Sequence, residues 1–122
     1  MGALHFDNVV LGEDALLGQL NRGFHIMMSV LDKGRVGIAS LAVGIAQAGL
    51  DAALDYAKTR RQFGKPIAEN QGLQWMLADM AKDIAAARAL VHRAAMLMDA
   101  GAPATIDCSI AKCFASDTAV QH

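Results

Sequence analysis

Apolar residues follow two different patterns along this chain, and the change between them falls near residue 20. Residues 5–10 mix apolar and polar side chains as a short extended segment does, and residues 12–14 form a turn-type sequence. After residue 20 the apolar positions recur at steps of three and four, which is the period of an α-helix. Because a lone strand cannot bury its own face, we expect residues 1–19 to be an extended tail that belongs to a structure outside this chain.

The first helix is predicted from about residue 21 to about residue 60. Residues 36–48 contain hardly a polar side chain apart from Ser40 and Gln47, which predicts that the helix is buried on several sides. Gly34 is the expected weak point of the helix. The positions expected to form its main apolar face, widened by Met28 and Val43, are Phe24, Met27, Leu31, Ile38, Leu41, Ile45 and Leu54.

A second helix is predicted from about Asn70, a residue type suited to the N-cap, to the break at Gly101. Pro103 is placed before or at the start of a third helix. The second helix should bury Leu73, Leu77, Met80, Ile84, Ala87, Val91 and Met98, and the third should bury Ile106, Ile110, Cys113, Phe114 and Ala119. We therefore expect an all-α fold, an up-and-down bundle in which residues 20–122 supply three long helices of a four-helix domain and stop before its last helix.

Composition narrows the functional classes. A net charge of −1 gives no electrostatic reason to expect nucleic acid or an anionic membrane as a partner. The most apolar stretch, residues 36–50, is shorter than the roughly 20 residues of a membrane span. The four histidines show no pair at metal-ligand spacing, so no metal site is expected. Cys108 and Cys113 are expected to be buried and reduced.

The segment Leu31–Arg35 places charged residues and a glycine inside an otherwise apolar helix. Burying these charges costs several kcal/mol unless they are paired. Two interpretations follow from the spacing alone: the charges pair with each other and face water, or they line a groove for a ligand.

The segment Arg60–Pro66, followed by Asn70 and Gln71, gathers three cations and side-chain amides around a turn that also contains Phe63. Such a group can hold a pyrophosphate. It can also be a basic helix end with an aromatic residue that anchors the turn, and the residue types alone do not exclude either interpretation.

Several motifs occur in collinear order over almost the whole chain: Gly23-Phe24, Leu31-Asp32-x-Gly34-Arg35, Gly44-Ile45-Ala46-Gln47, Tyr56-Ala57-x-x-Arg60-x-Gln62-Phe63-Gly64-Lys65-Pro66-Ile67, Leu77-Ala78-Asp79-Met80-Ala81 and Ala111-Lys112-x-Phe114-Ala115. Together they resemble the C-terminal helical-bundle domain of the acyl-CoA dehydrogenase family. The run from Arg60 to Pro66 is the most specific of them. Gly12 departs from the pattern, because a proline is common at that position.

The resemblance implies a flavoenzyme with FAD as cofactor and an acyl-CoA as substrate, active in fatty-acid or branched-chain amino-acid catabolism. The flavin accepts a hydride from the β-carbon after a glutamate removes the α-proton. The resemblance further implies that residues 1–19 are the extended segment that connects a middle β-domain to this bundle. The resemblance also implies which residues contact the FAD bound in the neighbouring subunit: Arg60, Gln62, Phe63 and Gln71. The implied contacts with the CoA arm are Asp32, Lys33, Gly34 and Arg35.

The resemblance also implies an electron-transferring flavoprotein as partner and a homodimer or homotetramer. The location would be cytoplasmic in a bacterium or the mitochondrial matrix in a eukaryote. No catalytic base is expected in this chain, because the family's glutamate lies after the third helix or, in some branches, at the position of Gly34. We therefore expect the isolated fragment to be inactive. The alternatives are an acyl-CoA oxidase or flavin monooxygenase of the same superfamily and, from another class, a non-enzymatic helical oligomerisation module.

Overall fold

The computed structural model describes residues 2–122, which form two compact units, residues 2–30 and Leu31–His122. The first unit contains an irregular segment, the 3₁₀ helix η1 (Glu13–Ala15) and the first two turns of α1. Residues 5–10 form no strand in the described part of the chain. The large apolar side chains of residues 2–20 are exposed, so this unit has no apolar core of its own.

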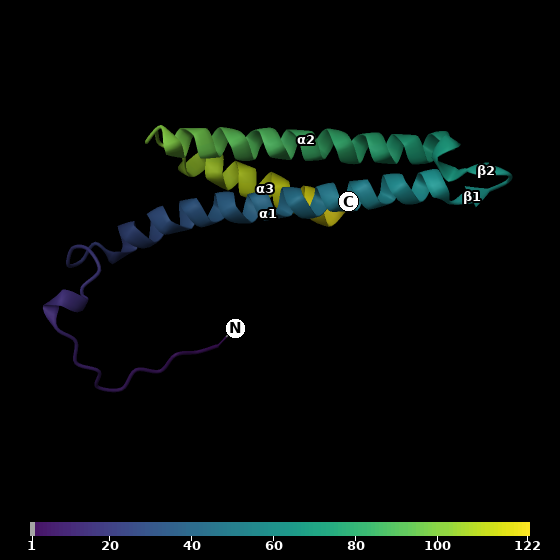
Figure 1. Cartoon of the computed structure of the whole chain (residues 1–122). Coiled ribbons are helices and arrows are strands. Elements are labelled where there is room, and N and C mark those ends of the chain that lie inside the picture. Colours follow the sequence, from purple (N-terminus) through teal and green to yellow (C-terminus); the bar gives the residue numbers. More distant parts are fainter. Residues whose placement is uncertain (1) are drawn as a thin grey trace. The chain divides into compact units, whose positions relative to one another are not determined.

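The second unit is built on α1 (Gly23–Thr59), α2 (Gln71–Asp99) and α3 (Thr105–Gln121), the three long helices labelled in Figure 1. The expected all-α fold is confirmed. Helix α1 continues through Gly34 without a break. A glycine inside a helix costs about 1 kcal/mol relative to alanine, and the packing of the turns that follow is sufficient to offset this.

Helix α1 contributes a row of mostly small residues to the core: Ala39, Ala42, Val43, Ala46 and Leu50. They recur at steps of three and four and so lie on one face of the helix. Small side chains let helix backbones approach closely, and this face packs with buried residues of α2 and α3 in one cluster. By length and composition alone α1 could also cross a membrane, but core helices that bury such a face meet the same criteria.

The predicted apolar face of α1 was wrong. Ile38, Leu41 and Ile45 are each more than half exposed in this chain, so the predicted burial on several sides is not found. The sequence pattern gives greater weight to large apolar residues, whereas close helix packing selects the alanine face next to it. The larger side chains are left on the outer surface.

Helix α2 buries the predicted seam, with Ile84, Ala87 and Val91 at its centre. The helix ends at a turn in which Gly101 has φ +66. The Ala102 N–H donates to the Leu97 carbonyl at 2.9 Å, and the Gly101 N–H donates to the Met98 carbonyl at 3.0 Å. This is the Schellman arrangement, which satisfies the last carbonyls of a helix and requires a residue that tolerates positive φ.

Helix α3 buries Cys108, Ala111, Ala115 and Thr118, not the larger residues predicted for its apolar face. Of the two thiols, only Cys108 is buried, and burial raises its pKa above the usual value. Cys113 is exposed, so the prediction of two buried thiols was half wrong. The reason is the same as for α1, because small side chains bring α3 close to its neighbours.

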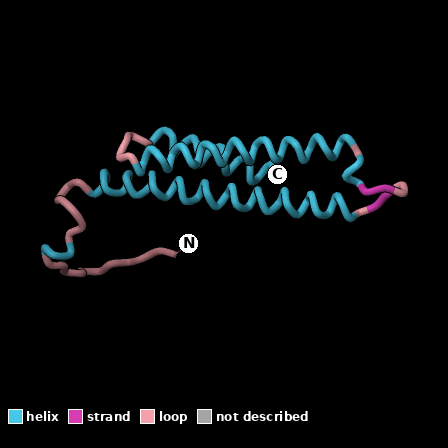
Figure 2. The backbone as a smooth tube through the Cα atoms, turned by 45° about the horizontal axis from the view of Figure 1, so that its top comes forward, coloured by secondary structure: helices cyan, strands magenta, loops and turns pink. Residues whose placement is uncertain are grey.

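Two very short strands connect α1 to the rest of the bundle. Strand β1 (Arg61–Gln62) pairs antiparallel with β2 (Lys65–Pro66), and the 3₁₀ helix η2 (Ile67–Glu69) leads into α2. Figure 2 shows this hairpin as the only strand pair in the described chain, projecting beyond the ends of the helices. The sequence predicted a turn here but not the strand pairing.

Candidate functional site

The hairpin has a two-residue turn, Phe63-Gly64, in which both residues have positive φ, +52 and +80. Two positive φ values in a two-residue hairpin loop are typical of a type I′ turn, for which asparagine and glycine are the preferred residues. Phenylalanine is disfavoured in this conformation. Its ring is nonetheless 96% exposed. A strained, fully exposed aromatic residue does not stabilise the hairpin, which favours a role in ligand contact.

Arg60 and Arg61 are expected to lie on opposite faces of this hairpin. Side chains alternate along an extended chain, so Arg60 shares a face with Gln62, and the register places Lys65 opposite Gln62. The Arg61 guanidinium donates back to the Gly64 carbonyl of its own turn at 3.5 Å. Within residues 2–122 the Arg60 guanidinium has no side-chain hydrogen bond, so its donors are available to a ligand.

A side-chain hydrogen bond from the first turn of α2 holds η2, which connects the hairpin to this helix. Gln74 Nε2 donates to the Ala68 carbonyl at 2.9 Å, and Asn70 precedes the helix as its N-cap residue without a side-chain cap hydrogen bond. Gln71 is therefore the first residue of α2, exposed at the same end of the bundle as the hairpin (Figure 1). The structure thus gathers the four predicted cofactor-binding residues at one end of α1.

The predicted substrate-arm residues behave differently from one another. The Arg35 guanidinium donates to Asp32 Oδ1 at 2.6 Å, so the charges in this segment of α1 do pair. The Thr105 hydroxyl of α3 donates to the other carboxylate oxygen, Oδ2, at 2.6 Å. Lys33 and Gly34 are exposed on α1 and do not join this cluster. A Cβ added to Gly34 would meet nothing within 4 Å.

The two groups of predicted site residues are far apart along α1. Thr59 lies 27 positions after Asp32 in one continuous helix, which corresponds to about 40 Å at 1.5 Å per residue. The hairpin that follows Thr59 therefore cannot reach a small molecule bound at Asp32. These residues belong to two distinct surfaces of the chain.

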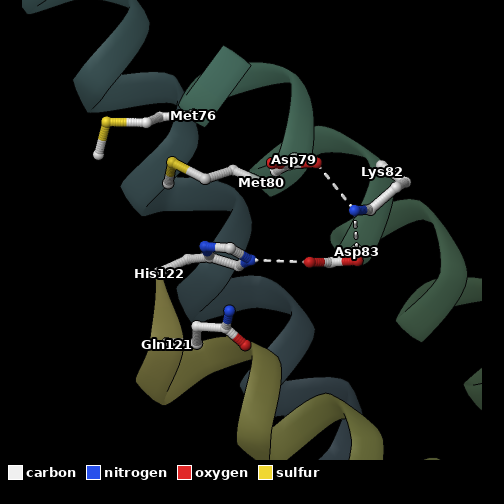
Figure 3. Close-up of a pocket in the computed structure, with 7 residues that line it drawn as sticks. All are labelled: Met76, Asp79, Met80, Lys82, Asp83, Gln121 and His122. Atoms are coloured by element: carbon white, nitrogen blue, oxygen red, sulfur yellow. Dashed lines mark hydrogen bonds and ion pairs between the residues drawn. The ribbon is translucent and has the colours of Figure 1, made fainter. Parts of the chain in front are cut away.

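A pocket of about 320 Å³ lies between α2 and the end of α3. In it His122 Nε2 lies 3.1 Å from Asp83 Oδ2, and Lys82 lies near both Asp79 and Asp83 (Figure 3). The hydrogen bond with His122 is the main cause that holds the Asp83 pKa below its usual value. The residues that line the pocket include no hydroxyl or thiol nucleophile. We interpret the Asp83–His122 hydrogen bond as a link between α2 and α3.

Sequence reasoning missed Thr105, His122 and Asp83. Thr105 pairs with Asp32 and His122 pairs with Asp83, in each case across a long stretch of sequence. No sequence motif marks either pair. Among residues 2–122 no group of three or more His, Cys, Asp or Glu side chains is arranged to hold a metal ion.

Three long helices, with an exposed hairpin between the first and the second, define a helical-bundle domain. Residues 21–122 match the family model described as acyl-CoA dehydrogenase, C-terminal domain, and the chain belongs to this family. The expected family is confirmed.

Individual proteins similar to this chain support the same family assignment. An acyl-CoA dehydrogenase of Bacillus subtilis is 53% identical over 118 residues, which cover 97% of this chain and 31% of that protein. The caffeyl-CoA reductase–Etf complex subunit CarC of Acetobacterium woodii is 47% identical over 111 residues, 91% of this chain and 29% of that protein. The structure of butyryl-CoA dehydrogenase from Megasphaera elsdenii matches with a TM-score of 0.93 and 46% identity, over 95% of this chain and 30% of that one. The chain therefore spans about 30% of the length of these relatives.

Proposed function

We propose that this chain is the C-terminal helical domain of an FAD-dependent acyl-CoA dehydrogenase that catalyses the α,β-dehydrogenation of an acyl-CoA thioester. Residues 1–19 would lead out of a middle β-domain, and residues 20–122 would form the bundle. The observation that carries the proposal is the hairpin in a member of this family. In it Phe63 is strained and exposed, and the nearby Arg60 guanidinium makes no side-chain hydrogen bond within residues 2–122.

Arg60, Gln62, Phe63 and Gln71 form the proposed FAD-contacting surface. Their chemistry fits this cofactor: the planar guanidinium of Arg60 suits a pyrophosphate, the amides of Gln62 and Gln71 both donate and accept, and the Phe63 ring offers a flat apolar face. When bound, FAD would accept a hydride equivalent from the substrate. The part played by this chain is to bind and orient the cofactor.

Asp32, Lys33, Gly34 and Arg35 form the proposed surface for the CoA arm. Asp32 neutralises one side of the Arg35 guanidinium, and an arginine has five N–H donors, so several remain for amide or phosphate oxygens of the substrate. Lys33 adds an exposed positive charge beside them. Gly34 leaves open space on the helix, which allows an extended ligand to lie close to the backbone.

Two features support a homodimer or homotetramer. The distance of about 40 Å between the hairpin and Asp32 means that the two surfaces serve different bound molecules, as expected if the hairpin contacts FAD of a neighbouring subunit. In addition, Ile38, Leu41 and Ile45 expose a contiguous apolar stripe on α1. Stripes of this kind are typical of surfaces that become covered on assembly.

We further propose an electron-transferring flavoprotein as the electron acceptor, supported by the relative named as a subunit of an Etf complex. The compartment would be the cytoplasm of a bacterium or the mitochondrial matrix of a eukaryote. An acyl-CoA oxidase is the second enzyme candidate, and it would pass its electrons to oxygen instead.

The proposal is tested by anaerobic titration of the full-length protein with saturated acyl-CoAs of increasing chain length. We expect it to be purified with FAD and the flavin absorbance to bleach on addition of one class of acyl-CoA. Rapid recolouring by oxygen alone would identify an oxidase. A protein purified without flavin that shows no change with any thioester would contradict the proposal and favour a non-enzymatic oligomerisation module.

A further inference from the structure

Thr105 makes the side-chain hydrogen bond with the largest sequence separation seen among the described residues. Its hydroxyl donates to Asp32 Oδ2 at 2.6 Å across 73 residues. Thr105 is the first residue of α3, and Asp32 lies in the third turn of α1. The contact therefore fixes the start of α3 to the segment of α1 that we assign to the CoA arm.

The Asp32 carboxylate is held from both sides. Oδ1 accepts from Arg35 and Oδ2 accepts from Thr105, each at 2.6 Å. Hydrogen bonds to an ionised carboxylate are shorter and stronger than those between neutral groups. The Asp32 side chain is 20% exposed, whereas that of Arg35 is 36% exposed. The carboxylate is thus the enclosed, fixed member of the pair, and the guanidinium is the member that meets solvent or a ligand.

The Thr105 hydroxyl donates its hydrogen bond to another helix and not to a group of α3. The N-cap residue of α3 is Ala104, which has no side-chain oxygen, so α3 begins without a side-chain cap hydrogen bond. The Asp32 carboxylate faces the positive end of α3 instead, an arrangement that the helix dipole favours. The raised pKa of Cys108 is consistent with this placement, because burial and then the Asp32 charge are its largest causes.

We propose that Thr105 is a positioning residue for substrate binding, which sets the rotation of the Asp32 carboxylate and through it the direction in which Arg35 presents its free N–H groups to the CoA arm. This inference rests on the function proposed above. Without the hydroxyl, Asp32 would keep its bond with Arg35, but the pair would be free to turn together. Contacts with the CoA arm would weaken, whereas the reacting end of the substrate would be unaffected.

The test compares Thr105→Val and Thr105→Ser in the full-length holoenzyme, with two substrates that carry the same acyl group. One substrate is the CoA thioester, and the other is the N-acetylcysteamine thioester, which lacks the CoA arm. For Thr105→Val we expect KM for the CoA thioester to rise roughly tenfold, the scale of one hydrogen bond to a charged group. We expect kcat to be unchanged, and kcat/KM for the truncated thioester to be unchanged. Thr105→Ser should restore the parent KM.

Two further variants separate positioning from folding. Ser116→Ala removes a hydroxyl of α3 that bonds only to its own helix, at the Lys112 carbonyl, and it should leave KM unchanged. Asp32→Asn should raise KM for the CoA thioester. If Thr105 acts through Asp32, the double variant should be no worse than Asp32→Asn alone.

The outcomes distinguish this inference from the proposed function. If the parent enzyme oxidises acyl-CoAs and Asp32→Asn raises KM, but Thr105→Val behaves as the parent, the positioning role is overturned and the function stands. Equal losses with both thioesters would also overturn it, because a general packing defect would then be responsible. A parent that oxidises no acyl-CoA would overturn both proposals.

Discussion

The Arg88 guanidinium of α2 donates a 2.8 Å hydrogen bond to the side-chain oxygen of Gln47 on α1. The Gln47 amide in turn donates to Asp51 one turn further along α1, at 2.9 Å. Gln47 was one of two polar residues in the apolar stretch of the first predicted helix. Its partner explains its presence there, because it links the two longest helices beside a core of small side chains.

We expect Gln47→Met and Arg88→Met each to lower the free energy of unfolding, because each removes one partner of this bond. In a double-mutant cycle the two changes should show a coupling energy of about 0.5–1 kcal/mol, a value reduced by the exposure of Arg88. Denaturant unfolding of the four proteins gives the coupling directly. Additive effects would mean that the bond contributes nothing to stability in solution.

The two neighbouring arginines of the hairpin should differ in their effect on flavin binding. Arg60→Ala should weaken FAD binding to the full-length protein roughly tenfold or more, because a charge-assisted bond contributes about 1.5–3 kcal/mol. Arg61→Ala should have a small effect, since the Arg61 guanidinium faces its own turn. Flavin dissociation constants measure both. A larger loss at Arg61 would assign the cofactor contact to the other arginine, and two small effects would leave the turn with a structural role only.

Phe63→Asn should separate stability from cofactor binding. Asparagine tolerates the positive φ of this position, and Asn-Gly is a preferred type I′ pair, so the variant should raise the unfolding free energy of the flavin-free protein by about 0.5–1 kcal/mol. The loss of the aromatic ring should weaken FAD binding. Thermal melts with and without added FAD provide the comparison. A variant that is less stable without flavin would contradict the interpretation of strain.

Replacing a glycine inside a helix and replacing one in the turn after a helix should change the free energy of unfolding in opposite directions. Gly49 lies within α1, where an added Cβ meets nothing within 4 Å, so Gly49→Ala should stabilise the fold by about 1 kcal/mol through helix propensity. Gly101 has φ +66, so Gly101→Ala should destabilise it by about 1 kcal/mol. Melting temperatures of the two variants in one background check both signs. Destabilisation by Gly49→Ala would indicate that another part of the assembled protein lies against this glycine.

The Asp83–His122 hydrogen bond should make the folding stability of the protein depend on pH in the acidic range. The folded-state pKa of Asp83 lies below its usual value of 3.8, so its contribution is complete above that pH and is lost as the pH falls through the lower folded value. The parent should therefore be more stable than Asp83→Asn at neutral pH, and the difference should shrink below pH 3.8. Melting temperatures of both proteins from pH 6 downward test this. A difference that does not change over this range would exclude the carboxylate charge as its cause.

The sequence predicted the helices well because their limits depend on local signals. Gly101 and Pro103 break the chain between α2 and α3, and the basic turn ends α1. The buried faces of α1 and α3 were predicted incorrectly, because periodicity ranks positions by hydrophobicity, whereas Ala39, Ala111 and their neighbours are buried because they are small.

The candidate site was predictable only in its local part. The hairpin residues are adjacent in sequence, and the three-residue spacing of Asp32 and Arg35 puts them on one helix face, so their pairing was one of two interpretations that the sequence allowed. The contribution of Thr105 was not predictable. It depends on how α3 returns to α1, which is set by tertiary packing and leaves no periodic signal.

Helix α1 joins the two proposed binding surfaces without any break, and this gives it a fixed rotational phase as well as a fixed length. Every residue of an α-helix turns the chain by about 100° and advances it by about 1.5 Å. Deletion of Ala52 alone would thus leave both surfaces chemically intact but would rotate the hairpin through more than a quarter of a turn relative to Asp32. The number of residues between Asp32 and the hairpin is therefore itself a functional constraint, and we expect α1 to tolerate changes of side chain far better than changes of length.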